Sequence, residues 1–128
     1  MSKFHHIAIS TTDFDKTVDF YKEVFGLKER CRFTLDDGRT GAMLWLTCGG
    51  IVEIFSGGTN EAETNPRLGH FSIAVDDVQA TYKKAIELGA KPAVEPTELD
   101  IPSTPPLPVT IAFFYGIGGE YVELFKER

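Results

Sequence analysis

The chain has 128 residues, of which 42% are hydrophobic and 25% are charged, and these fractions are typical of one globular domain with its own core. Its formal net charge of −6 argues against nucleic-acid binding, because phosphate contacts need clustered Lys and Arg side chains. No apolar run reaches the length of about 18 residues that a membrane span needs. We therefore expect a protein that binds neither nucleic acid nor membrane.

The N-terminal residues and the cysteines bear on the compartment. The first six residues, Met-Ser-Lys-Phe-His-His, do not open an apolar stretch of signal-peptide length. Cys31 and Cys48 have neither CxxC spacing nor further cysteines that would build a disulfide framework. We expect both to be reduced structural thiols and the protein to be cytoplasmic.

The pattern of the first half predicts a strand, a helix and three further strands. Thr12 or Asp13 can cap the helix at its start, and Gly26 can end it. Asp36-Asp37-Gly38 is a strong hairpin-turn signal. The predicted ranges are 4–10 for the first strand, 14–25 for the helix, and 27–35, 42–47 and 51–55 for the other strands.

After a polar stretch over 57–67, which we interpret as a linker, the same order of elements begins again. Asp76 or Asp77 can cap the second helix, and Gly89 can end it. The prolines of the segment 96–108 predict irregular structure there, either a loop that covers a pocket or a plain surface connection. The predicted ranges are strand 70–75, helix 78–88, and strands 91–94, 109–115 and 120–125.

The two halves are repeats of one pattern. A shift of 64 residues, from 6 to 70, superimposes His6 on His70 and Asp13 on Asp77. Near the end of each half, the segment 51–55 (Ile-Val-Glu-Ile-Phe) matches the segment 121–125 (Tyr-Val-Glu-Leu-Phe). Each half thus carries one histidine at the start of a strand and one glutamate within a later strand.

These four residues, His6, Glu53, His70 and Glu123, are candidate ligands of one divalent metal. Each histidine or glutamate alone is more simply read as a polar surface residue, and His5 competes with His6 for the role. The duplication decides between them, since the residue before His70 is a glycine. Imidazole and carboxylate donors without a thiolate suit Zn²⁺, Ni²⁺, Co²⁺, Fe²⁺ or Mn²⁺.

The neighbours of the two glutamates predict which way their side chains point. Each is flanked by aliphatic residues in its strand, so alternation places both carboxylates on the sheet face opposite the helix. A carboxylate on such a face is costly to bury without a partner, and a cation would supply that partner.

The chain resembles the vicinal oxygen chelate superfamily, which includes glyoxalase I, extradiol dioxygenases and bleomycin-resistance proteins. The resemblance covers essentially the whole chain and rests on these segments: 6–9 (His-Ile-Ala-Ile), 19–27 (Asp-Phe-Tyr-Lys-Glu-Val-Phe-Gly-Leu), 69–77 and 119–124. It implies an α+β fold of two tandem βαβββ modules that form a cupped mixed sheet. We expect a single domain over 1–128, with modules at about 4–57 and 68–126.

The resemblance also implies a chemistry. The ligand pattern of His6, Glu53, His70 and Glu123 is similar to that of glyoxalase I, a lyase. By analogy, Glu123, or else Glu53, would take a proton from the carbon next to a carbonyl, and the metal would stabilise the resulting ene-diolate. The alternatives are an epimerase-like or thiol-transferase metalloenzyme of the same superfamily, and a metal-free small-molecule binding or resistance protein.

Two positions depart from the glutathione-using members. Those enzymes generally carry an arginine where this chain has Ser10, and an asparagine shortly after the first glutamate, where it has Ser-Gly-Gly at 56–58. Arg32, Arg39 or Arg67 could supply the missing cation. The resemblance further implies a homodimer, with the site formed within one chain or across the dimer interface.

Overall fold

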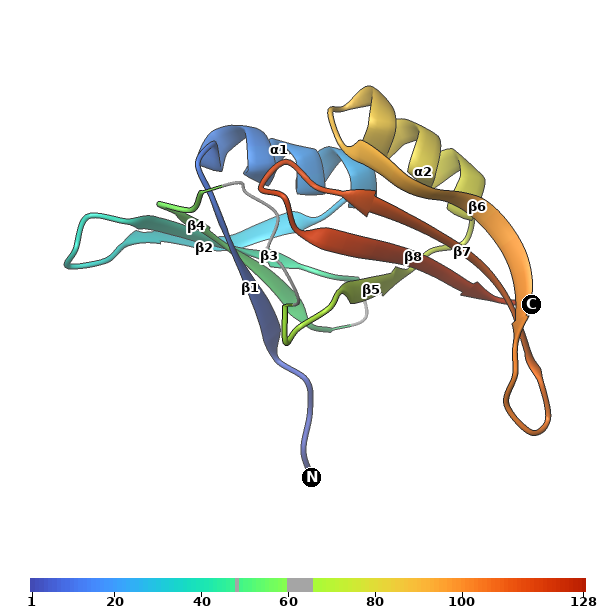
Figure 1. Cartoon of the computed structure of the whole chain (residues 1–128). Coiled ribbons are helices and arrows are strands. Elements are labelled where there is room, and N and C mark those ends of the chain that lie inside the picture. Colours follow the sequence, from blue (N-terminus) through green and yellow to red (C-terminus); the bar gives the residue numbers. More distant parts are fainter. Residues whose placement is uncertain (48, 60–65) are drawn as a thin grey trace. The chain divides into compact units, whose positions relative to one another are not determined.

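The computed structural model describes residues 1–47, 49–59 and 66–128, which form two compact units of the same topology (Figure 1). The first unit comprises Met1–Ala62 together with Ile117–Glu120, and the second comprises Glu63–Gly116 with Tyr121–Arg128. Each unit is one mixed four-stranded sheet with one helix. The predicted α+β fold of two βαβββ modules is therefore confirmed.

In the first unit the elements are β1 (His6–Thr11), α1 (Phe14–Phe25), β2 (Lys28–Thr34), β3 (Thr40–Trp45) and β4 (Ile51–Ser56). The strand order is β1-β4-β3-β2, with β1 parallel to β4 and the other pairs antiparallel. α1 packs on β3 and β4. The side chains buried between helix and sheet include Tyr21 of α1 and, from the strands, Leu44, Val52 and Ile54, all inaccessible to solvent.

The second unit contains β5 (Phe71–Ala74), α2 (Val78–Glu87), β6 (Lys91–Ile101), β7 (Leu107–Tyr115) and β8 (Tyr121–Glu127). Its order, β5-β8-β7-β6, repeats that of the first sheet, with β5 parallel to β8. α2 packs on β6, β7 and β8 over a core that includes Ala112, Phe114, Val122 and Leu124.

The helix ends follow from the predicted signals. The Asp13 carboxylate accepts a hydrogen bond from the Lys16 amide at 3.3 Å, and Asp77 accepts one from the Ala80 amide at 3.0 Å. Each satisfies an amide that the first helical turn leaves without a partner. α1 ends at Gly26, whose φ of 67° lies in the left-handed region that glycine adopts without strain.

The prediction for the proline-bearing segment 96–108 was wrong over much of its length. β6 extends to Ile101, and β7 begins at Leu107 and includes Pro108. β6 tolerates Pro92 and Pro96 because it is an edge strand, and its register with β7 shifts on either side of Val94. Only the exposed tip 102–106 is irregular, at the end of the long β6–β7 hairpin (Figure 1).

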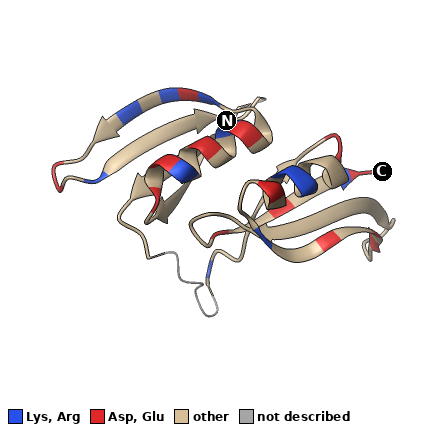
Figure 2. Ribbon diagram, turned by 90° about the horizontal axis from the view of Figure 1, so that it is seen from above, with Lys and Arg blue, Asp and Glu red and all other residues tan. Residues whose placement is uncertain are grey.

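The other edge strand, β2, is marked by charge rather than by proline. In Figure 2 the ribbon of β2 is marked by charged residues, mostly basic, and its first five residues are Lys-Glu-Arg-Cys-Arg. Charges on an exposed edge oppose pairing with the edge strand of another molecule. The predicted linker over 57–67 falls partly on 60–65, which are outside the described residues.

Candidate functional site

The first predicted pair, His6 and Glu53, comes together on the sheet of the first unit. β1 and β4 run parallel, with Ala8 opposite Glu53 in the register. His6 Nε2 lies 3.6 Å from Glu53 Oε1, and Glu53 is only 7% exposed. Its neighbours Val52 and Ile54 point into the core beneath α1, so the carboxylate lies on the opposite face.

The second unit repeats this arrangement with His70 and Glu123. His70 precedes β5 by one residue rather than opening the strand as predicted, and Ser72 is opposite Glu123 in the register. His70 Nε2 lies 3.2 Å from Glu123 Oε2. The imidazole side chain is 43% exposed and the carboxylate side chain 12%, so one partner faces solvent and the other is largely covered.

Both pairs fit the donor set of a divalent ion. Two donor atoms that bind one ion at about 2.0–2.2 Å lie roughly 3.0–3.5 Å apart at octahedral to tetrahedral angles. The separations of 3.6 and 3.2 Å are close to that range. Within the described ranges no group of three or more His, Cys, Asp or Glu side chains forms a ready cluster, so each unit offers two donors.

His5 has a place beside the first pair that the sequence did not reveal. Its Nδ1 lies 2.9 Å from Nδ1 of His6, while Nε2 of His6 faces Glu53. If His6 binds an ion through Nε2, its Nδ1 carries the proton and donates it to His5. A hydrogen bond on the second nitrogen fixes the ring orientation of a ligating histidine. The second unit has Gly69 at the matching position.

Comparison with known proteins places the chain in a family. The model of the Glyoxalase/Bleomycin resistance protein/Dioxygenase superfamily matches residues 3–101. The chain belongs to this superfamily. That match confirms the resemblance inferred from the motifs.

Individual members of the superfamily are distant in sequence. The chain is 27% identical to the uncharacterized protein YwbC of Bacillus subtilis (strain 168), over 97% of both chains. It is 29% identical to lactoylglutathione lyase GLX1 of Arabidopsis thaliana, over 73% of this chain and 35% of that protein. The crystal structure of glyoxalase I from Zea mays superimposes with a TM-score of 0.77 at 27% identity, over 96% of this chain and 44% of the maize chain. The chain thus spans less than half the length of both plant proteins.

Aromatic rings surround the second pair and were not anticipated from the sequence. The His70 ring stands edge-on to Phe113, with centroids 5.2 Å apart. Phe113 stacks on Tyr121 at 4.8 Å, and Tyr121 lies 4.8 Å from Tyr115. The sequence does contain a signal for this cluster. The aromatic residues at 113, 115 and 121 occupy strand positions whose side chains point away from the core, whereas the intervening Phe114 is buried. Such rings restrict water around Glu123 and offer apolar surface to a ligand.

Of the three arginines considered as replacements for the cation missing at Ser10, the structure favours Arg39. Its guanidinium lies 5.5 Å above the ring of Phe55, and Phe55 is opposite Ser10 in the register. Arg32 instead bonds Glu29 at 2.7 Å and lies over Phe14 at the start of α1. Arg67 is exposed and outside both sheets.

A buried carboxyl lies outside both pairs. Glu120 Oε1 accepts a hydrogen bond from the Gly118 amide at 3.0 Å, and Glu120 Oε2 is buried without a partner among the described residues. Burial raises the pKa of this carboxyl to about 7. Burial, and then the proximity of Glu120, raises the pKa of Tyr21, whose hydroxyl does not complete a well-formed hydrogen bond.

Two remaining sequence expectations concern the thiols and the membrane. Cys31 is exposed and free, whereas Cys48 is outside the described residues. In the described part of the chain, neither helix has the length and apolar character needed to cross a bilayer.

Proposed function

We propose that the protein is a metal-dependent lyase or isomerase of glyoxalase I type, in which His6, Glu53, His70 and Glu123 hold one divalent ion. The supporting observation is the pairing of imidazole with carboxylate in each unit, at 3.6 and 3.2 Å. The donors are nitrogen and oxygen without a thiolate, which suits Ni²⁺, Zn²⁺, Co²⁺, Fe²⁺ or Mn²⁺.

The bound ion would supply a Lewis acid for two neighbouring oxygens of a small substrate. Glu123 takes the proton from the carbon next to the carbonyl and returns it to the adjacent carbon, so no proton is gained or lost overall. The side chain of Glu123 is only 12% exposed and lies beside the rings that adjoin His70, so little water competes for this proton. Glu53 is the alternative base.

The residues around Ser10 bear on the substrate class. Where the glutathione-using enzymes have an arginine, Ser10 offers no charge, and a Cβ on Gly58 would come within 2.7 Å of the Ser10 carbonyl oxygen. The chain after β4 therefore packs against the end of β1 and leaves no room for an asparagine side chain there. Arg39 is the cation that could replace the missing one, and it is already paired with Asp37 at 2.8 Å. We infer that an acidic thiol such as glutathione is held differently, or that another thiol is used.

The experiment is metal reconstitution followed by an assay. Metal-free protein is loaded separately with Ni²⁺, Co²⁺, Zn²⁺, Fe²⁺ and Mn²⁺ and offered methylglyoxal with glutathione, bacillithiol or cysteine. We expect stoichiometric metal and turnover with at least one ion and thiol. Absence of turnover with every ion would refute the lyase, and unchanged metal content in both Glu53→Gln and Glu123→Gln would refute the ligand set.

Ser10 also favours a second candidate, a metalloenzyme of the same superfamily that acts on another carbon acid, such as an epimerase of thioesters. Both candidates use the same base, but only the second exchanges solvent deuterium into an α-carbon without a thiol. Nuclear magnetic resonance of a panel of acids and thioesters in deuterated water separates them. A metal-free binding protein would instead show no stoichiometric metal by elemental analysis. The expected homodimer is tested by light scattering on the eluting protein.

A further inference from the structure

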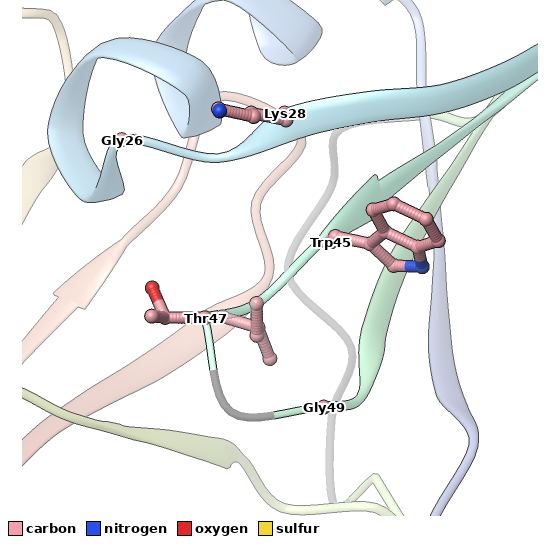
Figure 3. Close-up of a pocket in the computed structure, with 6 residues that line it drawn as sticks. Gly26, Lys28, Trp45, Thr47 and Gly49 are labelled. Atoms are coloured by element: carbon pink, nitrogen blue, oxygen red, sulfur yellow. The ribbon is translucent and has the colours of Figure 1, made fainter.

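A pocket of about 420 Å³ lies at one end of the first unit (Figure 3). Figure 3 shows Lys28 on β2, Trp45 at the end of β3 and Thr47 just beyond it around this space. Gly26 and Gly49 are also at its rim, and a Cβ built on either would meet nothing within 4 Å. The entrance is therefore open, and the volume is within the range of small-molecule sites, roughly 300–1,000 Å³.

Trp45 and Leu46 are the apolar residues that line the pocket. Trp45 is 50% exposed, although a tryptophan normally buries most of its large ring. Ile51 on β4 is the register partner of Trp45 on β3 and of His6 on β1. Register partners point to the same face of a sheet, and Ile51 shares its face with Glu53, two residues further along β4. The indole therefore lies on the sheet face that carries Glu53. The guanidinium of Arg30 covers one side of this ring, and the half-exposed remainder offers surface for stacking with a planar ligand.

Two cations accompany the indole. The guanidinium of Arg30 lies 5.4 Å above the Trp45 ring, and Lys28 is opposite Trp45 in the register. Arg30 is the extra residue at the β-bulge between Glu29 and Cys31, and bulges commonly redirect a side chain toward a site.

No carboxylate in the described part of the chain neutralises either cation. The carboxylate between them in sequence, Glu29, bonds Lys22 at 3.0 Å and Arg32 at 2.7 Å instead. Across the described ranges, no carboxylate forms an ion pair with Lys28 or Arg30. In a chain of net charge −6, this is a local positive patch that attracts anions.

We propose that this pocket binds a small aromatic carboxylate, with its ring stacked on Trp45. Its anionic group pairs with Lys28, which lines the pocket, and with Arg30, which adjoins the lining over the indole. The indole selects a planar ring, because a ring buries apolar area against it. The two cations select a negative charge over a neutral polar group. The site uses none of the four proposed metal ligands, so it is expected to bind its ligand in metal-free protein.

The test exploits Trp45 as the single tryptophan of the chain. Metal-free, nitrogen-15-labelled protein is titrated with benzoate, and the one indole N–H resonance is followed. Benzamide, which keeps the ring but not the charge, and acetate, which keeps the charge but not the ring, are the reference probes. We expect a saturable shift with benzoate, and binding of each reference probe at least about fivefold weaker.

Variants separate the charges from the ring. Lys28→Gln and Arg30→Gln are each expected to weaken benzoate binding about fivefold and to leave benzamide binding unchanged. Arg30→Lys keeps the charge and restores much of the affinity. The matched control is Lys83→Gln, which removes an exposed charge from α2 in the second unit and is expected to bind benzoate like the parent protein.

The proposal is overturned if the indole resonance does not saturate, if benzamide and acetate bind as tightly as benzoate, or if Lys28→Gln and Arg30→Gln behave like Lys83→Gln. Retained dispersion of the amide spectrum in every variant shows that the fold is intact, so a loss of binding then belongs to the pocket.

Discussion

The two units repeat one topology and one imidazole–carboxylate pair, yet they surround that pair with different chemistry. In the first unit, the same face carries Met43, Ile51 and Trp45, with His5 on the second nitrogen of His6. In the second unit, the matching register positions hold Phe113, Tyr121 and Tyr115, which stack on one another beside His70.

This difference indicates which features of the duplicated module are fixed and which are free to vary. The pairing of histidine with glutamate needs only the parallel register of the first and last strands, and both units keep it. The residues around the pair set apolarity and charge, and in the second unit Phe113 and Tyr121 contact the His70 ring. Both units keep a lysine opposite the outermost aromatic, Lys28 and Lys91. The first unit adds Arg30 over Trp45, and the second has become aromatic beside its pair.

The largest expected effect tests whether the two carboxylates are equivalent. With neutral glutamine at position 123 the base is lost, and we expect Glu123→Gln to lower kcat by about 10³-fold. Glu53→Gln is expected to lower kcat less and to weaken metal binding instead. Steady-state kinetics and metal analysis on the same samples distinguish the two. A greater fall in kcat for Glu53→Gln would place the base in the first unit.

A second prediction compares the two cores. Leu44 and Phe114 occupy matching positions beneath α1 and α2, and both are inaccessible to solvent. Removing the larger side chain leaves the larger cavity, so we expect Phe114→Ala to cost about 4 kcal/mol of unfolding free energy and Leu44→Ala about 3 kcal/mol. Urea unfolding followed by circular dichroism measures both. Losses below about 1 kcal/mol would contradict the packing described.

A third prediction concerns a group that only one of the two matching turns contains. Glu120 precedes β8, whereas Gly50 stands at the matching place before β4. Because burial raises the pKa of Glu120 to about 7, the folded state holds the proton more tightly than the unfolded chain. The stabilising contribution of the protonated Glu120 carboxyl is complete below the pKa that this group has in the unfolded chain. It is lost as the pH rises through about 7, the pKa of the group in the folded state.

Glu120→Gln removes that pH dependence. We expect the variant to be more stable than the parent by about 2 kcal/mol at pH 8 and to differ little at pH 4, since the parent carboxyl is then protonated. Thermal unfolding across this pH range is the measurement. Equal differences at both pH values would show that the carboxyl is not buried in solution.

The smallest expected effect concerns His5, which the second unit lacks. Without the hydrogen bond to Nδ1, the His6 ring is less well oriented, and we expect His5→Ala to weaken metal binding about tenfold. His5→Asn, which can still accept the bond, should recover part of this affinity, and Lys3→Ala is the control. Competition with a chelating dye measures the dissociation constants. Equal affinities for His5→Ala and the parent would show that the contact is incidental.

Much of the fold was predictable because its signals are local. Asp13 and Asp77 sit where helix caps are needed, and Gly26 adopts the left-handed conformation that ends α1. The segment 95–101 was not predictable in the same way. Its prolines argue against a strand in general, and only its position at the edge of the sheet, where one side needs no partner, makes the strand possible.

The sequence by itself determined the duplication, the βαβββ order and the four candidate ligands, because the alternation of side chains and the helix signals are written in neighbouring residues. Tertiary structure decided what lies beside those residues. Strand register brought His70 to Glu123 and His6 to Glu53, and it placed Arg39 over Phe55, the register partner of Ser10. It also set Trp45 beside Lys28 and Arg30, which pair with no carboxylate in the described part of the chain. Contacts between strands distant in sequence have no local signature, so they emerged only when the sheets were formed.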